Sequence, residues 1–452
     1  MALEQVNNYS NLFRVFPNDS IPPYVNNADG IYINTKDGRR ILDTTAGGTS
    51  YAILGWNHPK VNAALEAQIR RFGHMDYKIW SDENTNLLAN LLVSRAEHGL
   101  DKVYFAGNSG AEACEAAMKM SYQAHYDQGK KGKKWFISRM QSYHGSTSDT
   151  LSLGERPNLE FFRPMLSPYR ARIPMHHPLY LKKEDESLDN YAKRSAKELE
   201  NKIIEIGPEK VCAFVGETIM GGLVGDVPPA PSYWKYIREV CDRYDVHLIL
   251  DEVYCGTGTS GKIYCCDWDN VSPDFIFIGK TLAAGYGALS AVITSSEFED
   301  IIKNGQGRLQ HTTTHQAHSL SVAAALAVQK IIHNDKFLGH VINLGNYMRN
   351  TLREELEHHE YFRDIRGRGL RFSLEYDCEN KNKFGKKLQD VLYSKHNILI
   401  NAKWHRVCFT PALTITKDDL EHVLIKFIDT FKQVSSKWND KFRSQIKIKP
   451  IF

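Results

Sequence analysis

A lysine stands at the end of a short apolar run, where its amine would be held away from water. Lys280 follows the residues DFIFIG, and the stretch after it, TLAAGYGALSAV, contains no acidic partner. Desolvation lowers the affinity of a lysine for its proton, and the neutral amine is a nucleophile that can form a Schiff base with a carbonyl compound. The alternative is a lysine whose ammonium group reaches solvent at the end of a strand.

An acidic residue ends a second apolar run. Asp251 closes the residues VHLIL, and an ionised carboxylate in such a place is costly unless a cation meets it. The protonated pyridine nitrogen of a cofactor is a cation of that kind. The alternative is a cap of the following turn, because Glu252 and the glycine-rich residues CGTGTSGK come next.

Two small or hydroxyl-rich segments could bind a phosphate. Ser109 and Gly110 follow the run KVYFAG and open an amphipathic stretch, and the N-terminus of a helix presents free backbone N–H groups to an anion. Thr312, Thr313 and Thr314 precede the apolar stretch SLSVAAALAVQKII, and hydroxyl groups donate to phosphate oxygens. Ordinary helix capping is the alternative for both segments.

Other side chains follow further apolar runs. Tyr143 and His144 come after KWFISR, where ligands bind in parallel sheets, so the tyrosine can stack on a flat ring or simply pack a loop. Glu217 ends VCAFVGE in the same layer, and Arg406 lies in the strand-like residues WHRVCFTPAL. The two charges could form an ion pair that opens for a substrate, or each could be an ordinary surface charge.

The elements that must position these residues form an alternating pattern between about residues 60 and 330. Short apolar runs alternate with amphipathic stretches, which predicts a parallel α/β sheet whose strands are covered on both faces. The stretch from Gly154 to Leu188 is punctuated by prolines and is predicted to be a long surface loop. The predicted strands are Lys102 to Gly107, Lys134 to Arg139, Val211 to Glu217, Val246 to Val253, Asp274 to Lys280 and Leu289 to Ser295.

Both ends of the chain have a different pattern. The residues GIYINTKDGRRILD predict two antiparallel strands around the turn KDG. After residue 330, the helical pattern VINLGNYMRNTLREELEHH precedes RGRGLRFSLEY, which is predicted to be a strand after a glycine-rich turn. We therefore expect a large domain at 60–330 and a smaller α+β domain built from 1–59 and 331–452.

Composition excludes several classes of protein. The 452 residues are 42% hydrophobic and 24% charged, which is typical of a folded globular chain. A net charge of +4 gives no reason to expect a nucleic-acid partner, and the lysines at 130–134 and the basic tail at 437–452 are predicted to be solvated. No apolar run is long enough for a membrane span, and the first residues lack a targeting pattern, so we expect a cytoplasmic protein. The eight cysteines contain no CxxC pair and are expected to be reduced thiols, with no metal site.

Seven motifs occur in the order found in one known family. They are NSGAEACEAAMK, SYHGST, GETIMGG, HLILDEVYCGTGTSGK, PDFIFIGKTLAAGYGALSAV, HTTTHQAHSLSVAAALA and IRGRGLRFSLE. From about Gly47 to Thr416 the chain resembles the class III aminotransferases, which are pyridoxal-phosphate enzymes of fold type I. The resemblance implies an α/β fold, with a mainly parallel seven-stranded sheet in the large domain and a smaller α+β domain from both chain ends.

The resemblance also implies roles for the residues at the strand ends. Lys280 would link covalently to pyridoxal 5′-phosphate and then move a proton between substrate and cofactor. Asp251 would hold the pyridine nitrogen protonated. Ser109, Gly110 and Ala111 would hold the phosphate.

Further matched positions concern the ring, the partner subunit and the substrate. Tyr143 would stack on the cofactor ring, with His144 beside it in the same motif. Thr314 matches the threonine that reaches the phosphate bound by the neighbouring subunit, which implies a homodimer with active sites at the interface. Glu217 matches the acidic residue near the cofactor, and Arg406 matches the arginine that binds a carboxylate or pairs with that glutamate.

Two departures from the family pattern concern the surroundings of the site. Residues 256–261 read GTGTSG, so Thr259 stands where the family commonly has an arginine, and Ala412 replaces the second proline of PPL. Both affect local packing and the choice of donor rather than the chemistry at Lys280. Tyr51 and Trp80 are candidates for the walls of the substrate pocket, with core packing as an equal alternative.

The resemblance implies an aminotransferase that moves an amino group from an amine or amino acid to a keto acid such as pyruvate or 2-oxoglutarate by a ping-pong mechanism. Primary amines, taurine-like sulfonates, ω-amino acids and α-amino acids are all open as donors. The nearest alternatives are an amino-acid racemase or epimerase and a decarboxylating transaminase on the same scaffold. A cofactor-binding regulator is disfavoured by the presence of both Lys280 and Asp251, and a nicotinamide dehydrogenase by the lack of GxGxxG after the first strand.

Overall fold

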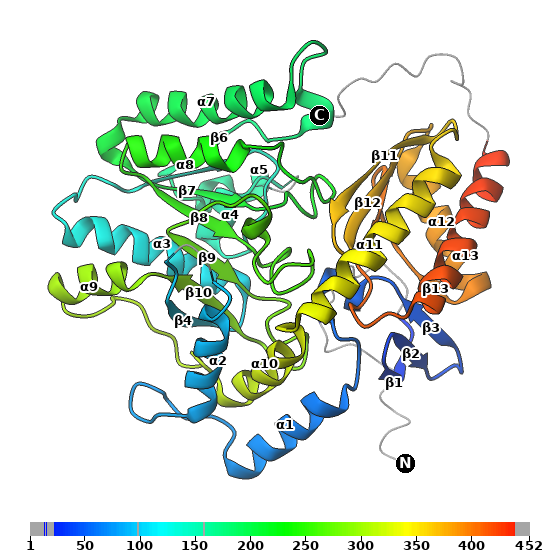
Figure 1. The fold of residues 1–452 in the computed structure, drawn as a ribbon, viewed down its shortest axis with the longest axis horizontal. Helices are drawn as coiled ribbons and strands as arrows, with labels where there is room; N and C mark the ends of the chain where they lie inside the picture. Colours follow the sequence, from blue (N-terminus) through cyan, green and yellow to red (C-terminus); the bar gives the residue numbers. More distant parts are fainter. Residues whose placement is uncertain (1–12, 14, 16–21, 97–98, 157–158, 439–452) are drawn as a thin grey trace.

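Two lobes form the molecule, one around a large central sheet and one around two small sheets (Figure 1). The computed structural model describes residues 13, 15, 22–96, 99–156 and 159–438, so most of the basic tail and most of the first 21 residues lie outside the described part. Within that part, no helix is both long and apolar enough to cross a bilayer.

The larger lobe is built on a seven-stranded sheet with the strand order β4-β10-β9-β8-β7-β5-β6. Only β10 runs antiparallel to its neighbours, so the mainly parallel sheet expected from the sequence is confirmed. The strands are β4 (Lys102–Gly107), β5 (Trp135–Arg139), β6 (Arg170–Ile173), β7 (Val211–Glu217), β8 (His247–Asp251), β9 (Phe275–Ile278) and β10 (Ser290–Thr294).

Apolar side chains alternate between the two faces of this sheet, and both faces are covered. In β8, Leu248 and Leu250 belong to one hydrophobic cluster and Ile249 to another. The second cluster is formed with α3, and the first with α7 and α8. The helices of this lobe are α1 (Pro59–Arg71), α2 (Glu83–Val93), α3 (Gly110–Asp127), α4 (Ser148–Leu153), α5 (Leu159–Phe162), α6 (Pro178–Leu181), α7 (Leu188–Ile206), α8 (Tyr233–Arg243), α9 (Ser296–Asn304) and α10 (Ser319–Ile332).

The prediction of one long loop from Gly154 to Leu188 is wrong. The described residues of this stretch include two short helices and the edge strand β6, which pairs in parallel with β5. The strand is polar because its arginines bind neighbours: Arg170 lies 2.5 Å from the Asp149 carboxylate, and Arg172 donates to the Gly154 carbonyl at 2.9 Å. An edge strand with such side chains lacks the apolar run by which the other strands were recognised.

The smaller lobe contains segments from both ends of the chain. The predicted hairpin forms β2 and β3, with Gly38 at φ +85° in the turn, where a side chain would be strained. The late strand β13 pairs in parallel with β3 and completes the sheet β1-β2-β3-β13. The second small sheet has the order β11-β12-β15-β14. The strands are β1 (Val25–Asp29), β2 (Tyr32–Thr35), β3 (Arg40–Asp43), β11 (Phe362–Arg368), β12 (Arg371–Tyr376), β13 (Ile398–Leu399), β14 (Asn401–Lys403) and β15 (Arg406–Phe409).

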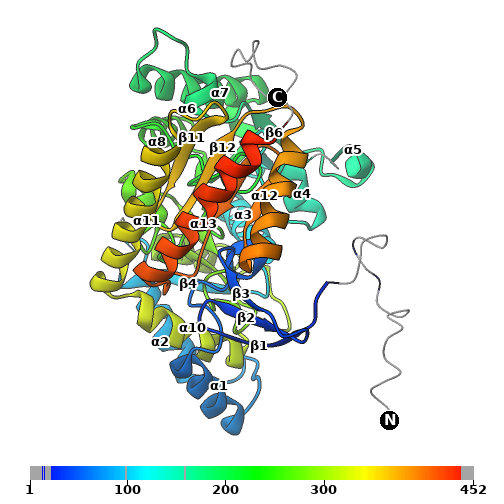
Figure 2. The same cartoon turned by 90° about the vertical axis from the view of Figure 1, so that its right-hand side faces the viewer.

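Three long helices lie on the outer side of this lobe, with α13 beside α11 and α12 (Figure 2). They are α11 (Asp335–Leu356), α12 (Lys381–His396) and α13 (Lys417–Ser436). The residues RGRGLRFSLEY form part of a β11–β12 hairpin, so the sequence before the glycine-rich turn is also a strand. The domain bounds at residues 60 and 330 stay predictions.

Candidate active site

Several of the side chains singled out in the sequence meet at one edge of the large sheet. Strands β4, β5, β7, β8 and β9 share a direction, so their carboxyl ends lie at the same edge. Lys280 follows β9 and is partly buried, with its Nζ atom 5.2 Å from the centre of the Tyr254 ring and 6.0 Å from that of Tyr143. Burial lowers the pKa of Lys280, Asp251 opposes this effect, and Arg371 adds to it.

Asp251 and His144 form a buried polar pair beneath this edge. The Asp251 side chain ends β8 and is 5% exposed. Its Oδ2 atom lies 2.8 Å from His144 Nδ1, and its Oδ1 accepts from the Val253 backbone N–H at 3.0 Å. Because an ionised carboxylate only accepts hydrogen bonds, the histidine donates from Nδ1. Within the described residues, His144 Nε2 is buried and has no partner.

A second buried carboxylate lies on the neighbouring strand. Glu217 ends β7 and is in register with Asp251 on β8. Burial raises the pKa of Glu217 to about 7; His144 and Arg139 oppose the shift, and Asp251 adds to it. The Gly221 backbone N–H donates weakly to the Glu217 carboxylate at 3.4 Å. The site therefore holds one carboxyl group that is paired and another that titrates near neutral pH.

The turn from β4 into α3 forms an anion-binding surface. Ser109 caps the helix and forms a reciprocal capping box with Glu112, whose carboxylate accepts the Asn108 and Ser109 backbone N–H groups at 2.7 and 2.9 Å. In the described part of the chain, the N–H groups of Gly110 and Ala111 have no acceptor. They lie at the positive end of a helix of 18 residues, which is where a phosphate binds well.

Glycines bring this turn close to the reactive lysine. A side chain at Gly110 would approach Val253 to 2.7 Å, and one at Gly279 would lie 3.2 Å from the Gly110 backbone. The residue before Lys280 therefore packs directly against the start of α3. This contact places the lysine, the end of β8 and the helix N-terminus around one small volume.

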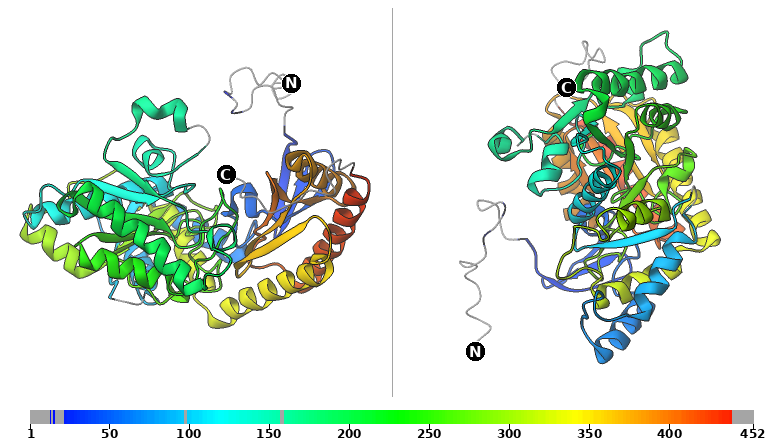
Figure 3. Two further views of the ribbon diagram at one scale, coloured as in Figure 1. Left: turned by 90° about the horizontal axis from the view of Figure 1, so that it is seen from above. Right: turned by 90° about the vertical axis from the view of Figure 1, so that its left-hand side faces the viewer.

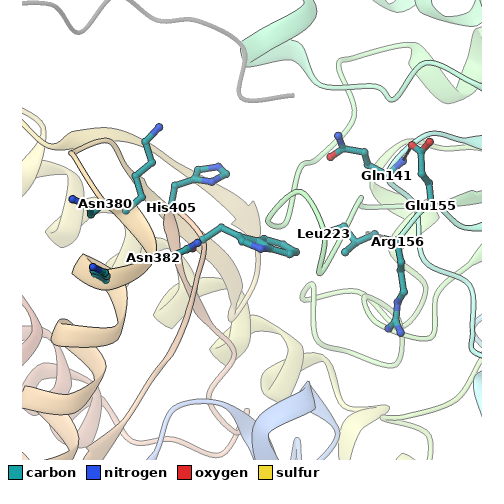
Figure 4. Close-up of a pocket in the computed structure, with 10 residues that line it drawn as sticks. Gln141, Glu155, Arg156, Leu223, Asn380, Asn382 and His405 are labelled. Carbon is teal, nitrogen blue, oxygen red and sulfur yellow. Dashed lines mark hydrogen bonds between the residues drawn. The ribbon is translucent and has the colours of Figure 1, made fainter. Parts of the chain in front are cut away.

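The Tyr143 ring lies near Lys280 and against Arg156, a residue that lines a cavity. The Arg156 guanidinium stacks 3.8 Å from the centre of the Tyr143 ring, and the Tyr143 hydroxyl lies 3.1 Å from Ser146 Oγ. Arg156 also lines a cavity of about 760 Å³ between the two lobes. Figure 4 shows Gln141, Glu155, Arg156 and Leu223 facing Asn380, Asn382 and His405. The complete lining is Gln141, Glu155, Arg156, Leu223, Asn380, Lys381, Asn382, Lys383, Trp404 and His405.

The predicted partner of Glu217 is held elsewhere. Arg406 is 1% exposed and donates to the carbonyls of Gly222 and Leu223 at 3.1 and 2.6 Å. No ion pair joins Arg406 and Glu217 among the described residues. Both side chains contact the 221–223 loop, since the Gly221 N–H donates to the glutamate. The ion pair considered from the sequence is therefore absent among the described residues.

Three further predicted residues lie apart from the lysine. Tyr51 is partly buried, and its ring fills the space beside Gly47 and Gly285. Trp80 is 62% exposed in the loop between α1 and α2. Thr314 is exposed, and its carbonyl lies 3.2 Å from a nitrogen of His74. None of the three contacts Lys280 within the described part of this single chain.

Sequence reasoning missed two residues beside the lysine. Tyr254 follows Asp251 in the segment DEVY, and its ring lies against Lys280. Arg371 lies on the other lobe, and its guanidinium is 3.4 Å from the centre of the Tyr254 ring. A charged residue within the buried strand RFSLEY was a usable signal for Arg371, whereas its nearness to Lys280 depends on how the two lobes meet.

A lysine amine, a buried carboxylate and a helix N-terminus around one volume are the three kinds of group that would hold pyridoxal 5′-phosphate. The carbonyl carbon of this cofactor matches Lys280, its pyridine nitrogen matches the buried Asp251, and its phosphate matches the free N–H groups of Gly110 and Ala111. The residues present therefore fit the group. The described residues contain no cluster of three or more side chains that could hold a metal ion.

The chain belongs to the class III aminotransferases, whose family model, aminotransferase class-III, matches residues 16–431. It is 33% identical over 429 residues to an uncharacterized aminotransferase of Schizosaccharomyces pombe, with 91% of this chain and 93% of that protein covered. It is 30% identical to gamma aminobutyrate transaminase 2 of Solanum lycopersicum, with 95% of each chain covered. The omega transaminase from Pseudomonas jessenii in complex with PMP has a similar structure, with a TM-score of 0.87, 27% identity and coverage of 94% and 97%.

These findings confirm the family, the fold type and the cofactor inferred from the sequence. The protein is a pyridoxal-phosphate-dependent enzyme that transfers an amino group to a keto acid. A racemase or epimerase is not favoured, since the relatives with a named activity are transaminases.

Proposed function

We propose that this aminotransferase takes its amino group from an ω-amino acid or a related amine and gives it to pyruvate or 2-oxoglutarate. The proposal is supported by the relatives named gamma aminobutyrate and omega transaminases. We propose a ping-pong mechanism, because donor and acceptor would use the same volume around Lys280 in turn. The observation that carries the function is the position of Lys280, partly buried at the sheet edge beside the Asp251–His144 pair.

Each residue has a distinct task in this proposal. Lys280 would hold the cofactor, and its amine, whose pKa is lowered by burial, would move a proton to or from the substrate carbon. Asp251 keeps its negative charge toward the pyridine nitrogen, and His144 fixes the orientation of that carboxylate. When bound, the cofactor supplies an electron sink for the substrate carbon.

The remaining residues bind and orient the cofactor and the substrate. Ser109, Gly110 and Ala111 hold the phosphate at the start of α3, and the Tyr143 ring stacks on the cofactor. Glu217, whose pKa of about 7 lets it be neutral or charged, faces the substrate side and can accept different donors and acceptors. Arg406 holds the 222–223 loop through its hydrogen bonds, next to Gly221, whose N–H donates to Glu217.

We also propose a homodimer, in which Thr314 reaches the phosphate of the partner subunit and the exposed Trp80 joins the pocket wall. The exposure of both residues in a single chain supports this arrangement. A reducing compartment such as the cytoplasm agrees with the eight cysteines, which are all buried free thiols. Relatives in Solanum lycopersicum and Oryza sativa carry the words chloroplastic and mitochondrial in their names, so organelles are the competing locations.

The test is an absorbance titration of the purified protein with a panel of amines in the absence of any keto acid. A true donor converts the bound cofactor to its amine form and bleaches the long-wavelength band, and pyruvate or 2-oxoglutarate then restores it. We expect γ-aminobutyrate or another ω-amino acid to bleach the band faster than α-amino acids. Bleaching by α-amino acids alone would contradict the proposed donor, and a band that no amine bleaches would contradict transfer itself.

A further inference from the structure

Arg371 is a buried cation that lacks a counter-charge. It is the first residue of β12, and its side chain is 1% exposed. Its Nε and Nη1 atoms are buried and have no hydrogen-bond partner among the described residues. Its guanidinium carbon lies 3.4 Å from the centre of the Tyr254 ring.

The other buried arginines nearby have more partners. Arg406 donates from Nη2 to two backbone carbonyls, although its Nε is buried without a partner among the described residues. Arg366 donates to two carbonyls and lies 2.7 Å from the Glu375 carboxylate. Arg371 has no such ion pair in the described part of the chain. A guanidinium without a partner is costly to bury, so an anion from outside the chain would find a strongly favourable place there.

The surroundings of Arg371 indicate where that anion would lie. Arg371 and Lys280 both contact the Tyr254 ring. The separation of the guanidinium carbon from the lysine Nζ is therefore at most the sum of their two distances to the ring centre. Arg371 also lowers the pKa of Lys280, which indicates that the two positive charges act on each other. A ligand that spans them would place an anionic group at the guanidinium and its reacting carbon at the lysine.

A buried carboxylate of the chain that, like Arg371, acts electrostatically on Tyr254 is already engaged. Asp226 is fully buried, and its Oδ2 accepts the Ser373 hydroxyl at 2.6 Å. Its Oδ1 has no partner, yet it forms no ion pair with Arg371 in the described part of the chain. Asp226 is therefore the competing explanation, in which the arginine exists only to balance this internal charge.

We infer that Arg371, rather than Arg406, binds the carboxylate of the keto-acid acceptor beside Lys280. This inference rests on the proposed function and narrows its substrate class to carboxylate-bearing compounds. Nε and Nη1 of Arg371 are both free to donate among the described residues, whereas Nη2 of Arg406 already donates to the carbonyls of the 222–223 loop and only its Nε is buried without a partner. Arginine suits this task because it stays charged even when buried and donates from several nitrogens to one carboxylate.

The experiment compares two acceptors with the holoenzyme, pyruvate and the uncharged aldehyde butanal. For Arg371→Gln, we expect the KM for pyruvate to rise roughly 10- to 100-fold, because charge-assisted hydrogen bonds are lost. The KM for butanal should change less than about threefold, since it has no carboxylate. Arg371→Lys should recover part of the effect because it keeps the charge. Arg406→Gln is the comparison variant and should alter both acceptors to a similar extent.

A second readout needs no turnover. Propionate is an unreactive carboxylate, and it should raise the unfolding temperature of the wild-type protein but not that of Arg371→Gln. An equal rise in both proteins, or an equal change of KM for pyruvate and butanal, would overturn the inference. If Asp226→Asn and Arg371→Gln both lose stability and neither changes propionate binding, the role of Arg371 is to balance the charge of Asp226 instead. If the wild-type protein uses no keto acid, the proposed function has failed, and propionate binding still tests Arg371.

Discussion

Glu217 and Asp251 are buried carboxylic acids on adjacent strands, and their surroundings separate their behaviour. Asp251 has a His144 nitrogen at 2.8 Å and a backbone N–H at 3.0 Å. Among the described residues, the Glu217 carboxylate has only the long hydrogen bond from Gly221, and burial raises its pKa to about 7. One well-paired carboxyl group and one that titrates near neutral pH therefore lie side by side at the sheet edge.

The raised pKa of Glu217 predicts a pH-dependent stability. The folded protein holds this proton up to about pH 7, whereas the unfolded chain releases it near the ordinary value of 4.5. The contribution of Glu217 is thus fully present below pH 4.5 and is lost as the pH rises to 7. Glu217→Gln cannot ionise, so its stability relative to the wild type should rise by roughly 1–3 kcal/mol between pH 5 and pH 8. Urea unfolding at both values measures this, and a constant difference would contradict the assigned pKa.

Lys280 gives a second prediction for a single residue. Lys280→Ala should lower amino transfer by at least about 10³-fold, because both the covalent link and the proton transfer are lost. The variant should keep the wild-type circular dichroism spectrum and unfolding temperature, since the removed amine is a cation whose pKa burial lowers. Lys303→Ala, on the exposed side of α9, is the control and should keep full activity. Wild-type transfer by Lys280→Ala would exclude the proposed role.

Among the elements, the position of β12 depends on how α11 packs on the β11–β12 turn. Gly345 of α11 lies against Gly369 in that turn, and a side chain there would come within 2.0 Å of the Gly369 carbonyl. Arg349 of the same helix donates to this carbonyl at 2.8 Å. Arg371 follows two residues later, so this close contact also fixes the guanidinium that lies against Tyr254.

Gly345→Ala should therefore destabilise the protein by about 1–3 kcal/mol, because the helix must move away from the turn. Gly339→Ala provides a matched control in the same helix. A side chain at Gly339 meets nothing within 4 Å, and alanine is the better helix former by up to about 1 kcal/mol, so this variant should be neutral or stabilised. Denaturant unfolding compares the two, and equal effects would show that the packing at Gly345 is not specific.

At the scale of the whole molecule, the two lobes lie side by side (Figure 3), and residues of both lobes line the cavity at Arg156. One further surface lacks a cover in the single chain. Ile79 and Trp80 are 71% and 62% exposed in the loop between α1 and α2. Apolar side chains in such a group are typical of an interface with another protein chain.

The proposed homodimer can be tested at this loop. Ile79→Glu combined with Trp80→Glu should shift the protein from dimer to monomer in sedimentation equilibrium and lower cofactor retention, because the partner's Thr314 would be lost. Ile204→Glu is the control: this residue is 54% exposed on α7, outside the proposed interface, and its replacement should leave the dimer intact. A dimer that persists in the double variant would contradict the proposed interface.

The sequence by itself determined the features that depend on residues close together in the chain. Lys280, Asp251, Glu217 and Tyr143 could be recognised because each follows a short apolar run, and parallel strands collect such ends at one edge. The start of α3 could also be recognised, because the Ser109 cap involves only residues close to it in the sequence. Burial on both faces gave most strands of the large sheet their continuous apolar character.

Only the tertiary structure decided the rest, because those features depend on contacts between distant segments. The edge strand β6 could not be recognised because its arginines are stabilised by partners elsewhere in the chain. Glu217 and Arg406 do not meet, since the 221–223 loop takes the hydrogen bonds of the arginine. Arg371 contacts Tyr254, the neighbour of Lys280, from the other lobe. This proximity depends on how the two lobes pack, so it could not be predicted from the spacing of the residues in the sequence.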